Sequence, residues 1–186
     1  MTGMAADAML FGVGTATIAW LSRKPLRCPG SHGFYRFFVW EGILALWVMN
    51  RNAWGMDPYS VNQMIAWPLL IISFVLVMLG VLALVSHGDI TRQRESTTLY
   101  DWEKTTTLVT HGIFAHIRHP MYASLLALAW AALLEAPSWP GAAIACGVTL
   151  LLLVTVLAEE RECLDYFGNA YAEYMRRTWR FVPGVF

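Results

Sequence analysis

The feature that most constrains this chain is a run of apolar residues long enough to cross a lipid bilayer. Residues Met64 to Ser86 contain no Asp, Glu, Lys or Arg, and a helix needs about 20 mostly apolar residues to cross the hydrocarbon core. In lipid, every backbone polar group must be hydrogen-bonded within the protein, so only helices and closed barrels span a membrane. We therefore expect a transmembrane helix over this run.

Four further segments share this apolar character, although each is weaker on its own. The second segment carries Arg36 and Glu41, and a carboxylate at that depth normally faces the bundle, so Glu41 is expected to pair with Arg36 or with a neighbouring helix. The five segments together predict an all-α polytopic membrane bundle with five transmembrane helices. The four additional segments run from about Met4 to Leu21, Phe34 to Asn50, Pro120 to Leu134 and Pro140 to Ala158.

The composition agrees with a membrane protein and excludes several other classes. Of the 186 residues, 57% are hydrophobic and 14% are charged, whereas a soluble domain has roughly 45–50% apolar and about 25% charged residues. The 13 basic residues balance the 13 acidic ones. A disordered chain, a basic nucleic-acid-binding protein and a disulfide scaffold are all excluded. We expect membrane lipids as partners and no nucleic acid.

The basic residues predict how the chain is oriented. All of them except Arg51 fall in the first loop, the third loop and the C-terminal tail, or beside these segments, and cytoplasmic loops collect Lys and Arg. The N-terminus is therefore expected outside and the C-terminus in the cytoplasm, which requires an odd number of spans. We expect a multi-pass protein, in the cell inner membrane, with one domain over 1–186. It divides into three spans (1–86), a cytoplasmic loop (87–119), a helical hairpin (120–158) and a cytoplasmic helical tail (159–186).

One candidate site lies where the fourth span begins. Pro120 suits the first position of a helix, where its missing N–H group costs nothing. The free N–H groups and the partial positive charge of that helix end, with Arg118 and His119 beside them, could bind a carboxylate or a phosphate. Alternatively, Arg118 is a topology anchor and His119 a capping residue.

A second candidate site lies at the inner end of the fifth span, where Glu159 and Glu160 are adjacent. Successive residues of a helix point about 100° apart, so at least one of these carboxylates should face the bundle. It could hold a cation or the hydroxyl groups of a ligand. Alternatively, both are solvated residues at a membrane exit.

The tail and the histidines favour simpler interpretations. Tyr171, Tyr174 and Arg177 fall at helical spacing, which predicts an interfacial helix with aromatic anchors. No Cys or carboxylate stands at ligand spacing around the histidines of the third loop, so no metal site is expected.

Two segments carry a resemblance to a known family. LVTHGIFAHIRHPMYAS (108–124) followed by EERECLDYFGNAYAEYMRRTWRFVPG (159–184) resembles the isoprenylcysteine carboxyl methyltransferase-like family of integral membrane methyltransferases, including its small prokaryotic members. More distantly, it resembles the integral-membrane phospholipid methyltransferases. The resemblance covers roughly the last 80 residues, and the first three spans match only in hydropathy.

The resemblance implies an enzyme that transfers a methyl group from S-adenosylmethionine to a lipophilic acceptor and leaves S-adenosylhomocysteine. The cofactor would be held on the cytoplasmic side, beneath the last two spans and the tail, and the acceptor would enter sideways from the bilayer. Phe114 stands where a tyrosine is common in the family. The residues that match the cofactor site are Thr106, Thr107, Leu108, Val109, Phe114, His119, Pro120, Met121, Tyr122 and Glu159.

One departure from the family bears on the acceptor. Four residues before Glu159, many members carry an arginine linked to the substrate, and this chain has Thr155. A carboxylate acceptor needs an arginine to hold it, and Arg177 or Arg180 could supply one in space. An amine or thiol acceptor needs a base, for which Glu160 or Glu159 is the candidate.

Two alternatives to this function stay open at the level of the sequence. Within the enzymes, the chain could be a phospholipid N-methyltransferase that acts on a lipid amine. From another class, it could be a non-catalytic membrane subunit or a small transporter. In that case the residues at the ends of the fourth and fifth spans would be ordinary boundary residues.

Overall fold

The structure is a computed structural model that describes residues 2–88 and 107–184, so the third-loop residues Arg92, Arg94, Lys104 and Thr106 lie outside the described residues. The described part of the chain is helical, with one isolated β-bridge between Ile117 and Trp179. Its elements are α1 (Thr2–Leu21), η1 (Pro25–Arg27), α2 (His32–Asn50), α3 (Val61–His87), η2 (Gly112–Ala115), α4 (Pro120–Glu135), α5 (Trp139–Phe167) and α6 (Asn169–Arg177).

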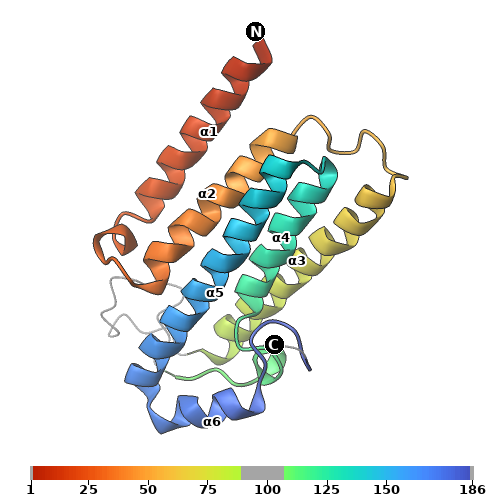
Figure 1. Cartoon of the computed structure of the whole chain (residues 1–186). Helices are drawn as coiled ribbons and strands as arrows, with labels where there is room; N and C mark the ends of the chain where they lie inside the picture. The colour runs from red at the N-terminus through yellow and green to blue at the C-terminus, as the bar shows by residue number, and fades with distance from the viewer. Residues whose placement is uncertain (1, 89–106, 185–186) are drawn as a thin grey trace.

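The five predicted long helices are present and alternate in direction (Figure 1). α5 differs most from its expected range, since it continues from the predicted end at Ala158 to Phe167. Its 29 residues make it about 43 Å long at 1.5 Å per residue. The connection between α1 and α2, residues 107–119 and α6 lie at one end of the bundle (Figure 1). The N-terminus and the two remaining helix connections lie at the other end.

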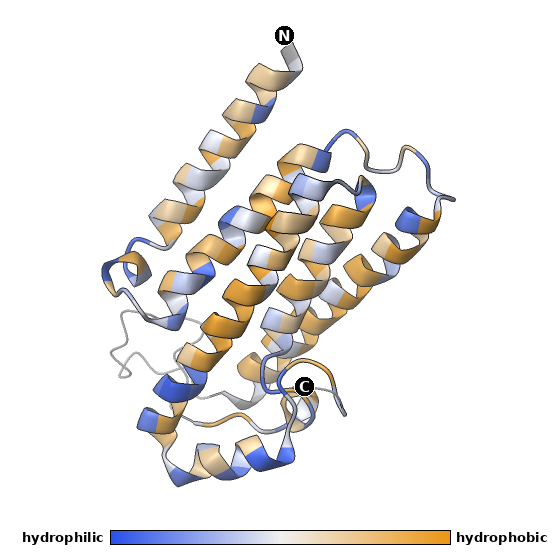
Figure 2. Ribbon diagram, in the orientation of Figure 1, coloured by the Kyte–Doolittle hydropathy of each residue, from blue (hydrophilic) through white to orange (hydrophobic). Residues whose placement is uncertain are grey.

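By length and composition, three of the described helices are apolar enough to cross a membrane. These are α1 over Gly3–Leu21, α3 over Val61–Ser86 and α5 over Trp139–Phe167. α4 is apolar but shorter, with 16 residues, and α2, which carries Arg36 and Glu41, is not among the three. Apolar side chains cover the outward faces of these helices (Figure 2).

The core lies where α2, α4 and α5 meet. Its fully buried side chains include Val39 and Leu46 of α2 and Leu152 and Val156 of α5. α4 contributes a face of buried alanines, and small residues allow membrane helices to approach closely. α3 packs against α4, and α1 packs against α2.

Two polar side chains within the bundle form hydrogen bonds to a neighbouring helix. Thr15 Oγ1 of α1 donates a hydrogen bond to Glu41 Oε2 at 2.7 Å, so the expectation that Glu41 faces a neighbouring helix is confirmed. Asn50 Nδ2 donates to the carbonyl of Ala132 at 2.7 Å. These pairs remove the cost of placing unbonded polar groups in an apolar environment.

The close packing of α2 against α5 predicts a matched pair of glycine variants. A Cβ atom on Gly42 would lie 2.4 Å from Val148 Cγ2, whereas one on Gly147 would meet nothing within 4 Å. We expect Gly42→Ala to lower the free energy of unfolding by about 1–3 kcal/mol because the core must shift. Gly147→Ala should cause no loss, and unfolding of both variants in the same detergent measures the difference. Equal stabilities would contradict this packing.

Candidate active site

The C-terminal segment folds back under the bundle because α5 ends at a glycine. Gly168 has φ = 58°, a left-handed conformation that glycine adopts without steric cost. α6 then turns Tyr171 and Tyr174 toward the protein, where they are 3% and 4% exposed. The prediction that these tyrosines are interfacial anchors is therefore wrong. They belong to the interior because the turn at Gly168 lays α6 beside the segment that leads into α4, where Tyr174 bonds to Phe114.

Backbone hydrogen bonds join the tail to the segment before α4. The amide of Arg118 donates to the carbonyl of Trp179 at 2.7 Å, and the amide of Trp179 donates to the carbonyl of His116 at 3.0 Å. Beyond this bridge, Phe181 is buried in the main core. The two segments that carry the family resemblance are therefore in direct contact.

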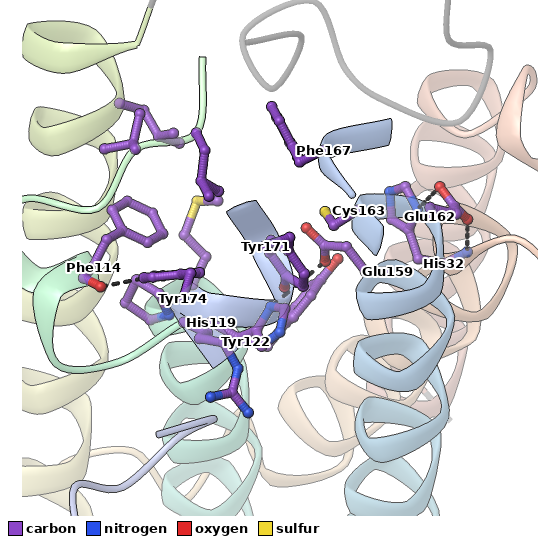
Figure 3. Close-up of a pocket in the computed structure, with 16 residues that line it drawn as sticks. His32, Phe114, His119, Tyr122, Glu159, Glu162, Cys163, Phe167, Tyr171 and Tyr174 are labelled. Carbon is purple, nitrogen blue, oxygen red and sulfur yellow. Dashed lines mark hydrogen bonds and ion pairs between the residues drawn. The ribbon is translucent and has the colours of Figure 1, made fainter. Parts of the chain in front are cut away.

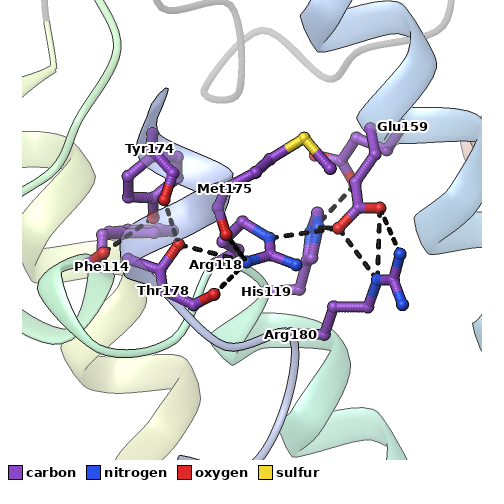
Figure 4. Close-up of polar contacts among 9 residues, drawn as sticks. Phe114, Arg118, His119, Glu159, Tyr174, Met175, Thr178 and Arg180 are labelled. Carbon is purple, nitrogen blue, oxygen red and sulfur yellow. Dashed lines mark hydrogen bonds and ion pairs between the residues drawn. The ribbon is translucent and has the colours of Figure 1, made fainter. Parts of the chain in front are cut away.

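The Arg118 side chain forms further hydrogen bonds that hold the tail against the segment before α4 (Figure 4). Its Nε donates to Glu160 Oε1 at 3.1 Å, and one terminal nitrogen donates to the carbonyls of Met175, at 3.0 Å, and of Thr178. These donors are engaged by protein oxygens, so the interpretation of Arg118 as part of an anion site finds no support in this geometry.

Glu160 is the acceptor at the centre of these contacts. It is 3% exposed, and it accepts hydrogen bonds from Arg118 and, at 3.0–3.2 Å, from Nε and a terminal nitrogen of Arg180. The bonds to Glu160 raise the pKa of Arg180 further above its ordinary value. A buried carboxylate held by two guanidinium groups is a strong tie between α5, the start of α4 and the tail.

A pocket opens beside this tie, between the start of α4, the end of α5 and α6 (Figure 3). Most of the predicted cofactor residues line it, namely Leu108, Val109, Phe114, His119, Pro120, Met121, Tyr122 and Glu159. The other lining residues are not among those that the family resemblance implies for the cofactor; they are His32, Leu84, Arg118, Glu162, Cys163, Phe167, Tyr171 and Tyr174.

The remaining predicted site residues lie elsewhere. Thr107 is exposed and does not line the pocket, and Thr106 is outside the described residues. Glu160 is directed to the arginines described above. Arg177 is exposed and, with Arg180, lines a separate polar depression on the other side of the tail.

Three buried polar atoms in the pocket lining have no hydrogen-bond partner. They are Glu159 Oε2, His119 Nε2 and His32 Nε2. His119 Nδ1 lies 3.8 Å from Glu159 Oε2, and His119 Nε2 lies 3.6 Å from Glu160 Oε1, which is too long for a hydrogen bond. Buried polar atoms normally have hydrogen-bond partners, so three without partners inside one pocket point to a bound ligand.

Tyr171 and Tyr174 contribute neutral side chains to the pocket. Tyr174 Oη donates to the carbonyl of Phe114 at 2.7 Å, which fixes the loop that carries Phe114. Burial raises the pKa of Tyr171 and of Tyr174, so both stay neutral. They form an aromatic wall of the pocket.

A second, apolar pocket of about 420 Å³ lies between α2, α3 and α4. It shares Leu84, Met121 and Tyr122 with the first pocket, so the two lie side by side. Val81 and Val85 of α3, which also line it, are 37% and 66% exposed on the apolar outer surface. The apolar pocket therefore lies next to the outer surface of the bundle.

Among the residues that the structure describes, no group of three or more His, Cys, Asp or Glu side chains is arranged to hold a metal ion.

The role of Glu160 as a tie is testable. In Glu160→Ala, two guanidinium groups lose their carboxylate, and breaking a buried ion pair costs roughly 3–5 kcal/mol. We expect the amides of Arg118, His119 and Trp179 to exchange hydrogen at least tenfold faster, measured by mass spectrometry. Glu173→Ala, which removes an exposed carboxylate of α6, is the control. Unchanged exchange in Glu160→Ala would show that the backbone bridge alone holds the tail.

Comparison with known proteins supports a family assignment. The chain is 24% identical over 151 residues to "Methanethiol S-methyltransferase" of Crocosphaera subtropica, which covers 80% of this chain and 55% of the relative. It is 31% identical over 72 residues to "Methanethiol S-methyltransferase 1" of Bradyrhizobium diazoefficiens, which covers 38% of this chain and 24% of the relative. The chain thus spans about half of the first relative and a quarter of the second. No solved structure matches it significantly.

The family match also extends the resemblance seen in the sequence. The sequence model of the family described as "Phospholipid methyltransferase" matches residues 61–170. The matched region begins with α3, so the third span belongs to the resemblance and is not similar in hydropathy alone. The region ends within α6 and contains the pocket residues of α3, of the segment before α4, of α4 and of α5. The resemblance to the integral membrane methyltransferases is confirmed, and the chain belongs to the phospholipid methyltransferase family.

Proposed function

We propose that the chain is a membrane methyltransferase that uses S-adenosylmethionine to methylate a lipophilic acceptor. The observation that carries this proposal is the pocket at the start of α4, where His119 and Glu159, both in the family-matched region, have buried polar atoms without hydrogen-bond partners. When bound, S-adenosylmethionine supplies a methyl group on a positively charged sulfur, ready for in-line displacement.

The residues of the pocket fit this cofactor chemically. Glu159 keeps one carboxylate oxygen without a hydrogen bond, and such an oxygen suits an ammonium or ribose hydroxyl donor. Phe114, Phe167 and Tyr171 give the pocket aromatic walls, which suit both an adenine ring and a sulfonium cation. The protein contributes alignment of the two reactants and exclusion of water.

The apolar pocket is the proposed binding site and entry path of the acceptor. Because it shares Met121 and Tyr122 with the polar pocket, an acceptor that lies in it can present its reactive end to the cofactor site. We propose that the acceptor enters from the bilayer between α3 and the neighbouring helices. A lipophilic acceptor is favoured because the lining, apart from Arg36 and Ser124, is composed of apolar and aromatic side chains.

The acceptor is better explained as a thiol than as a carboxylate. Thr155 stands where many relatives in the resemblance carry an arginine, and it is fully buried, with its hydroxyl donating to the carbonyl of Leu151 at 2.7 Å. Arg118 and Arg180 are bonded to Glu160, so the one guanidinium left in the described lining of the apolar pocket is that of Arg36. Both curated relatives are named for a thiol. A phospholipid amine is the second candidate, favoured by the family name.

We further propose five spans in the cell inner membrane, with the site on the cytoplasmic side. The proposal is supported by the position of the connection between α1 and α2, residues 107–119 and α6 at one end of the bundle, because these segments carry six of the ten Lys and Arg residues that the structure describes. Cytoplasmic segments are enriched in Lys and Arg.

The proposed function is tested by incubating the purified chain in lipid nanodiscs with methyl-labelled S-adenosylmethionine. Alkanethiols and a lipid extract from the expression host are offered as acceptors, and the labelled products are separated. Label in a thioether supports the thiol, and label in a lipid amine supports the second candidate. A chain that binds no cofactor would instead be a non-catalytic membrane protein.

The cofactor site is tested separately by two substitutions. Glu159→Gln removes a charged acceptor, and a hydrogen bond to a charged group is worth about 1.5–3 kcal/mol. We therefore expect S-adenosylhomocysteine to bind at least tenfold more weakly by calorimetry, and His119→Ala to have a similar effect. Glu173→Gln, on the exposed face of α6, should bind normally. Intact binding by both site variants would refute the assigned site.

A further inference from the structure

The pocket contains a histidine from a part of the chain that the family match does not include. His32 is the first residue of α2 and is 1% exposed, yet it lines the pocket together with residues of α4 and α5. The family match begins only at residue 61. In the view of Figure 3, Glu159 lies between His32 and His119.

Glu162 of α5 holds this histidine by two bonds. Glu162 Oε1 accepts a hydrogen bond from the backbone amide of His32 at 3.0 Å, and Oε2 lies 2.8 Å from His32 Nδ1. Ser31, the residue before it, caps α2 by accepting a hydrogen bond from the amide of Phe34. Both the backbone and the ring of His32 are therefore fixed in position.

The pair with Glu162 determines which ring nitrogen carries the proton. An ionised carboxylate only accepts hydrogen bonds, so in the neutral ring Nδ1 is the N–H donor and Nε2 holds the free lone pair. His32 Nε2 is buried and has no hydrogen-bond partner. A histidine that is oriented by a carboxylate through one nitrogen and free at the other is well arranged to accept a proton.

Three other candidate groups in or beside the pocket are less suited to that task. Glu160 is held ionised by Arg118 and Arg180, and a carboxylate in such a pair is a weak proton acceptor. Glu159 is the residue that we assign to the cofactor. Tyr174 donates its hydroxyl proton to the carbonyl of Phe114.

We propose that His32, oriented by Glu162, accepts the proton of a thiol acceptor during methyl transfer, an inference that rests on the function proposed above. The acceptor S–H bond breaks and its proton moves to His32 Nε2. The sulfur uses the released electron pair to form a bond to the methyl carbon, while the pair of the broken carbon–sulfonium bond stays on the sulfur of S-adenosylhomocysteine. His32 then returns the proton to water.

The charges around His32 favour the imidazolium that this step creates. The charged groups that face it are Glu159 and Glu162 of α5 and Arg36 of α2. Two carboxylates against one guanidinium leave a net negative environment, which stabilises a cationic ring.

The test uses His32→Asn in the full-length chain in nanodiscs. The Asn amide can occupy the position of Nδ1 and donate to Glu162, whereas nothing replaces Nε2, so the contact between α2 and α5 is preserved. His116→Asn is the matched control, because the side chain of His116 is exposed and does not line the pocket. Each variant is given an alkanethiol, which is protonated at neutral pH, and an acidic aromatic thiol, which is already ionised.

We expect His32→Asn to lower kcat/KM for the alkanethiol about 100-fold, as loss of a general base does, and to leave the aromatic thiol within a few-fold of the wild type. Calorimetric binding of S-adenosylhomocysteine should be unchanged, which also shows that the variant is folded. Equal losses for both thiols, no loss for either, or a weakened S-adenosylhomocysteine affinity would overturn the role of His32. A wild-type chain that methylates neither thiol would refute the proposed thiol acceptor and this role together, whereas a failure of His32 alone leaves wild-type methylation intact.

Discussion

The contact on which the rest of the site depends is the carboxylate of Glu160 between Arg118 and Arg180. It joins the end of α5, the residue before His119 and the C-terminal tail at one buried point. Charge pairs of this kind are costly to bury, and they hold a structure only when the remaining donors are also satisfied. Arg118 also donates to the carbonyls of Met175 and Thr178, so three segments that are remote in sequence are joined beside the pocket.

The bundle separates two environments that the chemistry needs. The long helices present apolar side chains outward, and α3 lines the apolar pocket. The polar pocket is lined by residues 108–122 and by α6, which lie at one end of the bundle (Figure 1). In an apolar surrounding an unpaired polar group is expensive. The buried polar atoms of the pocket that have no hydrogen-bond partner, such as Glu159 Oε2, are therefore the best candidates to bind a ligand.

Much of the site could be predicted because its residues lie close together along the chain. The residues around His119 form one continuous segment, and Glu159 lies at the end of a long apolar run. Glu162 and Cys163 follow Glu159 at the spacing of one helical turn, which places them on the same face, so this signal was present. His32 carried no such signal, because its part in the site depends on how α2 packs against α5.

The sequence by itself determined the five apolar helices, their approximate ends and the two segments that carry the family resemblance. Helix formation in an apolar chain follows from local composition, since each backbone group is satisfied within its own segment. Only the tertiary structure decided which polar side chains meet. It turned Tyr171 and Tyr174 inward, committed Glu160 to two arginines and brought His32 to the pocket. Such contacts depend on how segments that are far apart in the chain are placed and oriented relative to one another. A local pattern of residues does not determine that placement.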